Sequence, residues 1–567
     1  MLKFFMSVFT EEDNDEVPDM DMRTEAKMEK FEISKEEVHK LLQKVNTSKS
    51  PGPDEIHPRM IKELGDELST PLHILFNRSL KEGKIPTGWK MANITAIHKK
   101  DDKDDPNNYR PVSLTSIIGK LLETIVRDKI SDHMTKNKLF STKQYGFIKG
   151  RSTLLQMLTV MNKWTGWLDQ GGSIDSIYMD FQKAFDKVPH RRLISKLKKY
   201  GISEQCILWI TDFLKNRKQK VVVSGRESDC GDVISGIPQG SVLGPLLFVL
   251  FINDMPDDII TNIFLFADDT KIFNEISDPK GKTELQEDLK KLDRWAEKWK
   301  LRFHPGKCKI LSIGKRNRGD SRYELGDKEL KHSEEEKDIG IVIDKKLDFR
   351  EHMNLKIKKA NGIVGIIWRI FTTLYGKHMI KLFNTMARPH LEYCNSVWKP
   401  HKKGDMESLE KVLNRATKLV PKLKDLTPVE RLRRLKTPCL ALRRLRGDMI
   451  ETFKMLQGYY DPNVEKVLEL DENRRTRGHN LRLKQRPFKT DIGKFSFPSR
   501  TSRIWNALPK EIVNATSINS FKNRLDRLWK EEEMFYDYEK VFDYEHATVP
   551  VNRFNLEILD NSDEELT

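Results

Sequence analysis

Two adjacent aspartates, Asp268 and Asp269, stand between apolar runs in the segment N-I-F-L-F-A-D-D-T-K-I-F (262–273). Because side chains alternate faces along a strand, neighbouring carboxylates point to one site only at the tip of a turn, and strands over 263–267 and 271–273 would form that hairpin. Carboxylates this close raise each other's pKa unless a cation lies between them, and hard ions such as Mg²⁺ take oxygen ligands. For an isolated Asp-Asp pair, the alternative is an ordinary solvated turn.

A metal site of this kind needs a third carboxylate. Asp180 is the candidate because it ends the predicted strand S-I-D-S-I-Y-M-D (173–180), with Asp186 close behind it. A strand end beside a hairpin tip would complete a three-carboxylate site. Two metal ions bridged by such carboxylates activate an attacking 3′-hydroxyl and stabilise the leaving pyrophosphate. The pattern therefore predicts nucleotidyl transfer with two Mg²⁺ ions, and Mn²⁺ as the alternative ion.

The composition fits a polyanionic partner. Lys and Arg number 101 of 567 residues against 85 Asp and Glu, a formal net charge of +16. This balance points to nucleic acid, and the alternative is a well-solvated surface. The five cysteines are far apart with no C-x-x-C pair, which indicates a reducing compartment rather than disulfides or a zinc knuckle. No apolar run approaches the length of a transmembrane helix, so we expect a soluble, intracellular protein without membrane contact.

The segments that must position the acids alternate between helix and strand, which predicts an α/β or α+β middle of the chain. Residues 350–460 show an almost wholly helical and very basic pattern. Helical spacing is present over 33–45, 57–68, 71–82, 117–137, 189–200, 203–214, 243–251 and about 285–295. Strand patterns are present over 91–98, 173–180, 218–225, 309–312 and 339–343.

Six ordered motifs resemble the reverse transcriptase of non-LTR (LINE-type) retrotransposons, close to the jockey-like and chicken-repeat-like groups. The resemblance covers about residues 30–530 and implies an α+β right-hand polymerase with fingers, an antiparallel-sheet palm and a helical thumb, plus a basic, mostly helical C-terminal region. The motifs are K-S-P-G-P-D-E-I-H-P-R-M-I-K (49–62), Y-R-P-V-S-L-T-S (109–116), Q-Y-G-F-I-K-G-R-S-T (144–153), Y-M-D-F-Q-K-A-F-D-K-V-P-H (178–190), S-G-I-P-Q-G-S-V-L-G-P-L-L-F (235–248) and F-A-D-D-T (266–270).

The resemblance, taken with composition, gives an expected division of the chain. We expect a disordered lead or linker remnant, fingers and palm, a helical thumb and connection, a C-terminal region of unknown role, and an acidic, disordered tail. The expected boundaries are 1–30, 31–345, 346–460, 461–530 and 531–567. We also expect Lys356, Lys358 and Lys359 to face a nucleic-acid backbone, with R-L-R-R-L-K (431–436) continuing the track and ordinary solvation as the alternative.

The matched positions imply catalytic roles. Asp180 and Asp268 would be the principal metal ligands, with the Phe181 carbonyl contributing and Asp269 supporting. Phe185 matches the steric gate, whose ring fills the space that a ribose 2′-hydroxyl would need, and so favours a DNA product. The alternative for this residue is an ordinary core phenylalanine.

Further matches concern the nucleotide. Gln239 in S-G-I-P-Q-G-S would contact the sugar region, and Arg110 in Y-R-P-V would meet the triphosphate, with Lys99 or Lys100 assisting. Lys307 in H-P-G-K-C-K stands where these polymerases place a lysine that protonates departing pyrophosphate. A simple turn is the alternative for the loop of Gln239, and a solvated side chain is the alternative for Lys99.

These features predict an RNA-directed DNA polymerase that extends a DNA primer on an RNA template from dNTPs. The alternative is a truncated, inactive retroelement relic that only binds nucleic acid. An RNA-dependent RNA polymerase is disfavoured by Phe185. The family usually carries an endonuclease before the polymerase, and we expect that domain to be absent from this chain. Residence in nucleus and cytoplasm is expected from the resemblance alone.

Overall fold

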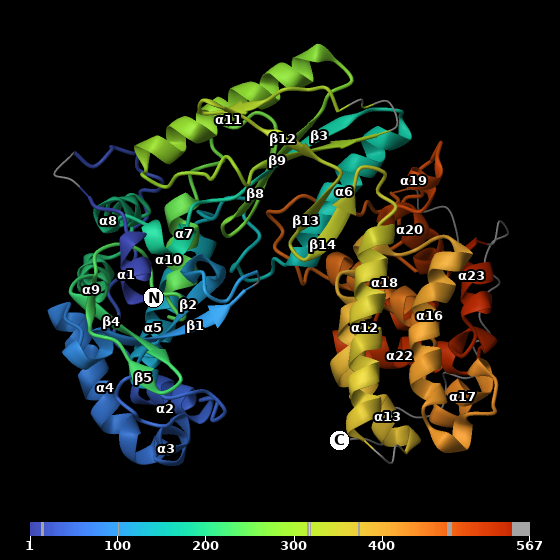
Figure 1. Ribbon diagram of the computed structural model, residues 1–567, viewed down its shortest axis with the longest axis horizontal. Coiled ribbons are helices and arrows are strands. Elements are labelled where there is room, and N and C mark those ends of the chain that lie inside the picture. The colour runs from blue at the N-terminus through green and yellow to red at the C-terminus, as the bar shows by residue number, and fades with distance from the viewer. Residues whose placement is uncertain are drawn as a thin grey trace.

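The computed structural model describes residues 1–12, 16–99, 101–314, 317, 319–371, 375–472 and 479–546. Within these ranges the fold is mixed α/β, with two five-stranded sheets and two two-stranded hairpins among many helices. Figure 1 shows an N-terminal lobe in blue and green, a central sheet at the top, and a helical C-terminal lobe in yellow to red. No helix in these ranges is both long enough and apolar enough to cross a bilayer.

The N-terminal lobe is built around the first five-stranded sheet. Strand β1 is central because it pairs antiparallel with β2 and parallel with β4. Its strands are β1 (Met91–His98), β2 (Tyr109–Leu114), β4 (Arg217–Val223), β5 (Arg226–Glu227) and β6 (Gly231–Val233). Its helices are α1 (Leu2–Ser7), α2 (Lys35–Gln43), α3 (Pro58–Glu63), α4 (Gly65–Glu82), α5 (Ile117–Lys136), α7 (Ala184–Lys187), α8 (His190–Lys199), α9 (Glu204–Leu214) and α10 (Gly244–Ile252). Short 3₁₀ turns lie at Thr87–Lys90 and Pro106–Asn108.

The central sheet has the strand order β12-β9-β3-β8-β7, with β3 in the middle. All its pairs are antiparallel except β12 with β9. Alternate residues enter different cores: Phe264 packs toward α6, whereas Ile263 and Leu265 pack toward α10 and α11. The sheet is therefore covered on both faces. Its elements are α6 (Thr153–Asp169), β3 (Ile174–Met179), β7 (Asn262–Phe266), β8 (Asp269–Glu275), α11 (Pro279–Lys298), β9 (Lys309–Ile313) and β12 (Lys331–Ser333).

The C-terminal lobe is helical and shares one apolar core with the α6 face of the sheet. Its helices are α12 (Arg350–Ile370), α13 (Gly376–Leu382), α14 (Arg388–Glu392), α15 (Asn395–Trp398), α16 (Lys403–Lys418), α17 (Pro428–Leu435), α18 (Leu440–Leu456), α19 (Asp491–Lys494), α20 (Phe497–Ala507), α21 (Lys510–Val513), α22 (Ile518–Lys530) and α23 (Tyr538–His546). A π-helical turn (Phe383–Ala387) and 3₁₀ turns (Pro421–Leu423, Glu533–Phe535) connect them. Two hairpins, β10 (Glu324–Leu325) with β11 (Lys328–Glu329) and β13 (Glu335–Asp338) with β14 (Ile341–Asp344), lie between sheet and lobe in the sequence.

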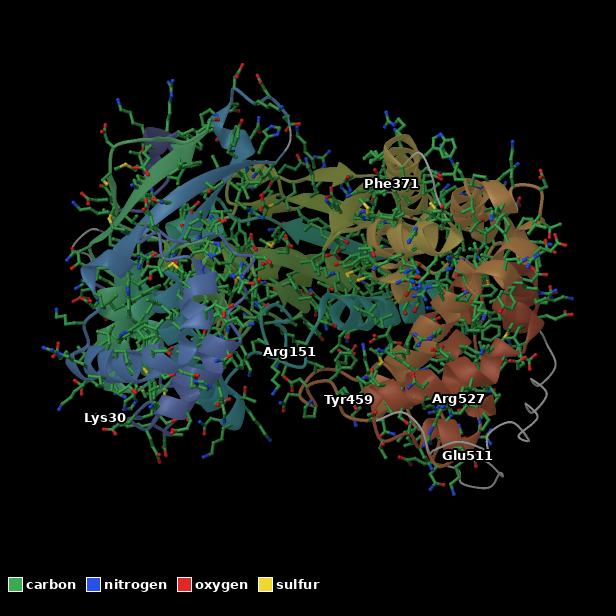
Figure 2. The ribbon with its side chains drawn as sticks, turned by 90° about the horizontal axis from the view of Figure 1, so that it is seen from below. Lys30, Arg151, Phe371, Tyr459, Glu511 and Arg527 are labelled. Atoms are coloured by element: carbon green, nitrogen blue, oxygen red, sulfur yellow. The ribbon has the colours of Figure 1, made fainter. Side chains whose placement is uncertain are left out.

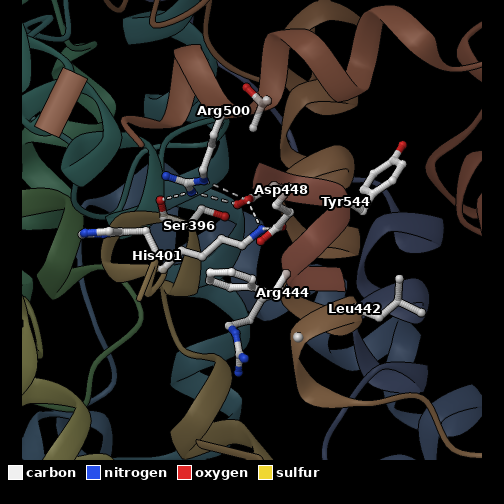
Figure 3. A network of polar contacts seen from close by, with 12 residues as sticks. Ser396, His401, Leu442, Arg444, Asp448, Arg500 and Tyr544 are labelled. Carbon is white, nitrogen blue, oxygen red and sulfur yellow. Dashed lines mark hydrogen bonds and ion pairs between the residues drawn. The ribbon is translucent and has the colours of Figure 1, made fainter. Parts of the chain in front are cut away.

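A buried ionic cluster holds the C-terminal lobe together (Figure 3). Asp448 on α18 is 1% exposed and accepts hydrogen bonds from Arg500 on α20 and from Lys399 after α15. Arg500 also donates to the Ser396 carbonyl, and Lys399 pairs with Glu545 on α23. Burial alone would raise the pKa of Asp448, but the Arg500 and Lys399 cations lower it to about 2. The cluster therefore joins α15, α18, α20 and α23.

The N-terminal segment differs from the expected disordered lead. Helix α1 packs its buried Phe5 against Ala92, Ile94 and Val221 of the first sheet. Glu12 accepts a hydrogen bond of 2.7 Å from the amide of Arg191 at the start of α8, and an acid is favourable at a helix N-terminus. The C-terminal tail also differs over the described range, because α23 forms within residues expected to be disordered and buries Val541. Residues 547–567 of that tail lie outside the described ranges.

A helix was predicted over 71–82 with its start at Pro71, but α4 runs from Gly65 through this proline. The helix break falls instead at Leu64, which ends α3. Gly65 follows the break, and a Cβ there would lie 3.0 Å from the Gln43 side chain of α2, so packing fixes the boundary. Pro71 therefore lies inside α4, where it donates no backbone hydrogen bond.

Several basic side chains of the C-terminal lobe are engaged inside the protein. Arg443 pairs with Glu392, Arg446 pairs with Asp526, and buried Arg431 donates to Thr417. Lys356 is half-buried and donates to the Gly340 carbonyl. The prediction of one continuous cationic track is therefore wrong for Arg431 and Lys356, because their charges serve internal contacts. Lys358 and Lys359, by contrast, are exposed on α12.

Candidate active site

The Asp-Asp pair lies at a two-residue hairpin turn, as its sequence predicts. Phe266 at the end of β7 pairs with Asp269 at the start of β8, and Ala267 and Asp268 form the turn between them. Ala267 is buried and has a φ of +53°, a left-handed conformation that costs free energy for a residue with a Cβ. Strain of this kind persists only where the surroundings enforce it, and it clusters at functional sites.

The third acid comes from the neighbouring strand. Met179, the last residue of β3, pairs with Thr270 of β8, so Asp180 follows at the same sheet edge as Asp269. The amide of His304 donates 2.7 Å to the Asp180 carbonyl oxygen, which fixes the backbone there. Lys307 Nζ lies 3.1 Å from Asp180 Oδ2, and both side chains are well exposed. The structure therefore brings Asp180, the Asp-Asp pair and Lys307 to one place.

Burial first, and then repulsion between carboxylates, raises the pKa values of the Asp268–Asp269 pair. Burial raises the pKa of Asp268, and the charge of Asp180 raises it further. The Asp269 side chain reaches solvent, yet the chain around it displaces much of its water. This desolvation, together with Asp268, Asp338 and Asp180, raises the pKa of Asp269 to about 6. Such a site favours a cation.

We expect Asp269→Asn to stabilise the metal-free protein at neutral pH. The folded carboxyl ionises at about 6, above the 3.8 of an ordinary aspartate, so wild-type stability falls as the pH rises through this window. The variant should therefore gain about 1 kcal/mol at pH 7.5, a figure reduced for solvent screening, and nothing below pH 4. Urea unfolding in EDTA at both pH values measures the gain. An equal difference at both would contradict the account.

Positive side chains surround the acids. Arg110 on β2 pairs in register with Ile97 of β1, and Lys99 follows β1 directly. Both residues therefore lie at the same end of the β1–β2 strand pair. Their charges reach Asp268, whose pKa they lower in part. Burial lowers the pKa of Lys99, and so do the neighbouring cations Arg110, Lys183 and Lys307. These four cations form a cluster suited to phosphate oxygens.

The loop S-G-I-P-Q-G packs against the segment after Asp180. The Gln239 side-chain amide donates 3.0 Å to Asp186 Oδ1, and the Ile237 amide donates 2.7 Å to the Phe185 carbonyl. Gly236 has a φ of +83°, and a Cβ there would lie 2.5 Å from the Asp186 carbonyl oxygen, so only glycine allows this approach. Gln239 and Phe185 are thereby held beside each other.

The Phe185 ring is half-buried and stacks on Phe248 of α10, with ring centroids 4.6 Å apart. Phe181 forms a bridge with Phe303 and stacks on it at 4.3 Å, which keeps the chain after Asp180 in register. The roles of the Phe185 ring as a steric gate and of the Phe181 carbonyl as a metal ligand stay predictions.

The donor set fits a divalent ion in chemistry and charge, because three carboxylates, which are hard oxygen donors, meet at one edge of the sheet. It is not a closed cage: among the described residues, no three His, Cys, Asp or Glu side chains are close enough to hold a metal ion. Lys307 instead neutralises Asp180. Metal binding at these residues would thus require Asp180 to exchange its lysine partner.

Two contributors were not predicted. Lys183 belongs to the cation cluster, and Gln144 accepts hydrogen bonds from the amides of Ala267 and Gly146. Gln144 begins the motif Q-Y-G-F, which the resemblance includes without giving this residue a role. A polar residue inside an ordered motif was the available signal. For Lys183, between Asp180 and Asp186, the sequence offers only position.

Comparison with known proteins agrees with this geometry. Residues 97–343 match the family described as reverse transcriptase (RNA-dependent DNA polymerase). The matched segment includes Asp180, the Asp-Asp hairpin and all four cations. This segment therefore matches the family that the ordered motifs predicted, and it contains five of the six motifs, all except the one at 49–62.

The curated relatives include RNA-directed DNA polymerases of mobile elements. The RNA-directed DNA polymerase from mobile element jockey of Drosophila melanogaster is 32% identical over 349 residues, which cover 60% of this chain and 38% of the relative. The jockey polymerase of Drosophila funebris is 30% identical over 379 residues, 65% of this chain and 41% of the relative. The probable RNA-directed DNA polymerase from transposon BS of Drosophila melanogaster is 30% identical over 346 residues, which cover 58% of this chain and 37% of the relative. The chain thus matches about two fifths of the length of these relatives.

Proposed function

We propose that the chain is an RNA-directed DNA polymerase that transfers nucleotides from dNTPs to the 3′-hydroxyl of a DNA primer paired with an RNA template. The observation that carries the proposal is the meeting of Asp180, Asp268 and Asp269 at one edge of the central sheet, within a reverse transcriptase domain. The names of the relatives, which are RNA-directed DNA polymerases, support it.

In this proposal the central sheet is the palm, the lobe of the first sheet is the fingers, and the helices from α12 onward begin the thumb. Such a polymerase copies any sequence, so it holds the duplex by its backbone through cationic surfaces. The net charge of +16 and the exposed Lys358 and Lys359 of α12 support this arrangement.

Asp180, Asp268, Asp269 and the Phe181 carbonyl would hold two Mg²⁺ ions, or Mn²⁺ in their place. When bound, such ions acidify the primer hydroxyl and neutralise charge on the leaving pyrophosphate. The protein's contribution is positional, since the hairpin turn fixes Asp268 and β3 fixes Asp180. The raised pKa values of Asp268 and Asp269 support an affinity for cations at this edge.

The cation cluster would receive the triphosphate. The planar Arg110 guanidinium suits two phosphate oxygens at once, and Lys99 and Lys183 add charge around it. Lys307 would leave Asp180, turn to the phosphates and donate its proton to the departing pyrophosphate. Gln239, fixed by Asp186, would lie beside the nucleotide sugar.

Primer extension on poly(rA)–oligo(dT) with dTTP tests the proposal. We expect Mg²⁺-dependent incorporation that EDTA abolishes. Retention of the RNA in a gel shift without incorporation would overturn the proposal and favour a binding-only relic. Preferential use of rNTPs on the same template would indicate RNA synthesis instead.

We expect Phe185→Ala to weaken the preference for dNTPs over rNTPs by about 10- to 100-fold in kcat/KM, because a smaller side chain leaves room for a 2′-hydroxyl. Single-nucleotide extension with dTTP and UTP gives the ratio. The matched control is Phe248→Leu, which removes the stacking partner but keeps the Phe185 ring. An unchanged ratio in Phe185→Ala would make Phe185 a core residue only.

A further inference from the structure

The buried side chain of Gln144 is bonded directly to the catalytic hairpin. Its Oε1 accepts from the Ala267 amide at 3.0 Å and from the Gly146 amide at 2.7 Å. Gln144 itself is 0% exposed. Ala267 is the residue with the left-handed conformation, and its amide lies one residue before Asp268. The Gln144 side-chain oxygen therefore binds the turn at Ala267, the residue with the strained backbone.

The backbone around Gln144 also pairs with β7. The Tyr145 amide donates 2.8 Å to the Leu265 carbonyl, and the Leu265 amide donates 2.9 Å to the Lys143 carbonyl. Gly146 lies so near that a Cβ there would be 2.7 Å from the Ala267 nitrogen. Residues 143–146 thus act as a short extra strand that ends on the turn, so a shift of this segment moves the turn.

A second layer fixes the segment 141–144 from the C-terminal side. Arg151, whose side chain is 1% exposed, donates to the carbonyls of Ser141 and Gln144 and pairs with Asp461 at 2.8 Å. The Asp461 amide in turn donates 3.0 Å to the Gly150 carbonyl. Asp461 follows α18, and Figure 2 labels Arg151 and Tyr459 at this junction between the two sides of the molecule. An unbroken series of hydrogen bonds and one ion pair therefore connects the C-terminal lobe to the hairpin.

We propose that Gln144 is a positioning residue for Asp268, and that the Arg151–Asp461 pair makes its position depend on the C-terminal lobe. The inference rests on the proposed function and gives the region after α18 a part in it. The hydrogen bond from the Ala267 amide offsets the strain at that residue, the bond from the Gly146 amide fixes the acceptor, and without this acceptor the turn is free to relax. Displacement of a catalytic group by about 1 Å costs about 100-fold in rate.

Gln144→Met tests the first step, because methionine keeps the length of the side chain but accepts no comparable hydrogen bond. We expect kcat for dTTP incorporation to fall about 30- to 100-fold. KM for dTTP and primer–template affinity should stay within about twofold, and the Mg²⁺ concentration for half-maximal activity should rise. The matched control is Gln156→Met on α6, another buried glutamine, whose Oε1 has no hydrogen-bond partner, and it should keep wild-type kinetics.

Hydrogen–deuterium exchange gives a readout that does not depend on activity. In Gln144→Met the peptide over 263–270 should exchange faster, whereas peptides of α18 should stay unchanged. Gln144→Glu keeps an acceptor oxygen and should restore slow exchange there. Unchanged exchange over 263–270 in Gln144→Met would overturn the positioning role, even if the rate fell.

Asp461→Asn tests the second step. It weakens the pair with Arg151, and we expect kcat to fall about 3- to 10-fold with the same rise in Mg²⁺ requirement and faster exchange over 141–146. The control is Glu465→Gln, which removes a pair with Lys163 of α6 in the same segment but touches neither Arg151 nor the turn. Equal kinetics for both variants would end the coupling to the C-terminal lobe.

The two levels of the proposal fail separately. If wild-type protein shows no Mg²⁺-dependent incorporation, the proposed function falls, while exchange over 263–270 still decides whether Gln144 holds the hairpin. If wild type is active and Gln144→Met matches Gln156→Met in kinetics and exchange, the positioning role falls and the proposed function stands.

Discussion

Asp268→Asn should lower nucleotide incorporation by at least about 10³-fold while the protein stays folded. The substitution keeps the size of the side chain at the hairpin turn and removes the charge that would hold a divalent ion against the primer hydroxyl. Folding should not suffer, because burial and the charge of Asp180 raise the pKa of Asp268 and so disfavour its ionised form in the folded protein. Loss of activity with unchanged or higher thermal stability is the combined signature.

Single-turnover extension of a primer on an RNA template measures this loss. Asp293→Asn on α11 is the matched control, because burial also raises the pKa of that carboxyl but the residue lies outside the site. We expect the control to keep wild-type rates. A decrease of less than tenfold in Asp268→Asn, with the control unchanged, would remove Asp268 from the catalytic set.

Asp448→Asn should destabilise the protein by about 3–5 kcal/mol. This carboxylate is 1% exposed and balances both Arg500 and Lys399, so its removal leaves buried cations without a full partner. Because the folded pKa of about 2 lies below the ordinary 3.8, the stabilisation is complete above about pH 4 and is lost as the pH falls toward 2. The difference between variant and wild type should therefore be largest at pH 7 and shrink by about 2 kcal/mol in acid, the free energy that a pKa shift of this size carries.

Urea unfolding followed by tryptophan fluorescence measures the difference. The control is Glu407→Gln, which breaks an exposed pair with Lys411 on α16 and should change the free energy of unfolding by less than about 0.5 kcal/mol. If Asp448→Asn lay within 1 kcal/mol of wild type at pH 7, the cluster would not hold α15, α18, α20 and α23 together.

The sequence predicts the parts of the site that depend on local pattern. The run of apolar residues on each side of Asp268 defines the hairpin, and strand β3 has the predicted strand pattern up to Asp180. The pairing of Met179 with Thr270 then confirms that these remote segments meet. The order of the six motifs along the chain indicated the reverse transcriptase family, and the family match over residues 97–343 confirms it.

What the sequence does not predict depends on contacts between distant segments. The partners of Gln144 and Arg151 lie over 100 and 300 positions away, and no periodicity links them. Arg431 belongs to a basic run that looks like a solvated face, yet Thr417 binds it inside the lobe. The acidic stretch after α1 gives no signal that Glu12 would cap α8. Charge pattern alone cannot separate an internal partner from a surface one.

Direct measurement of metal binding tests the central claim that three remote carboxylates converge to hold the ions. Mn²⁺ titration followed by electron paramagnetic resonance would use a complex with dideoxy-terminated primer, RNA template and the next dNTP. We expect the wild-type complex to bind two Mn²⁺ ions more than the primer–template and dNTP bind in the absence of protein. Asp180→Asn and Asp268→Asn should each lose at least one of these two ions. Equal Mn²⁺ uptake by wild type and both variants would contradict the account.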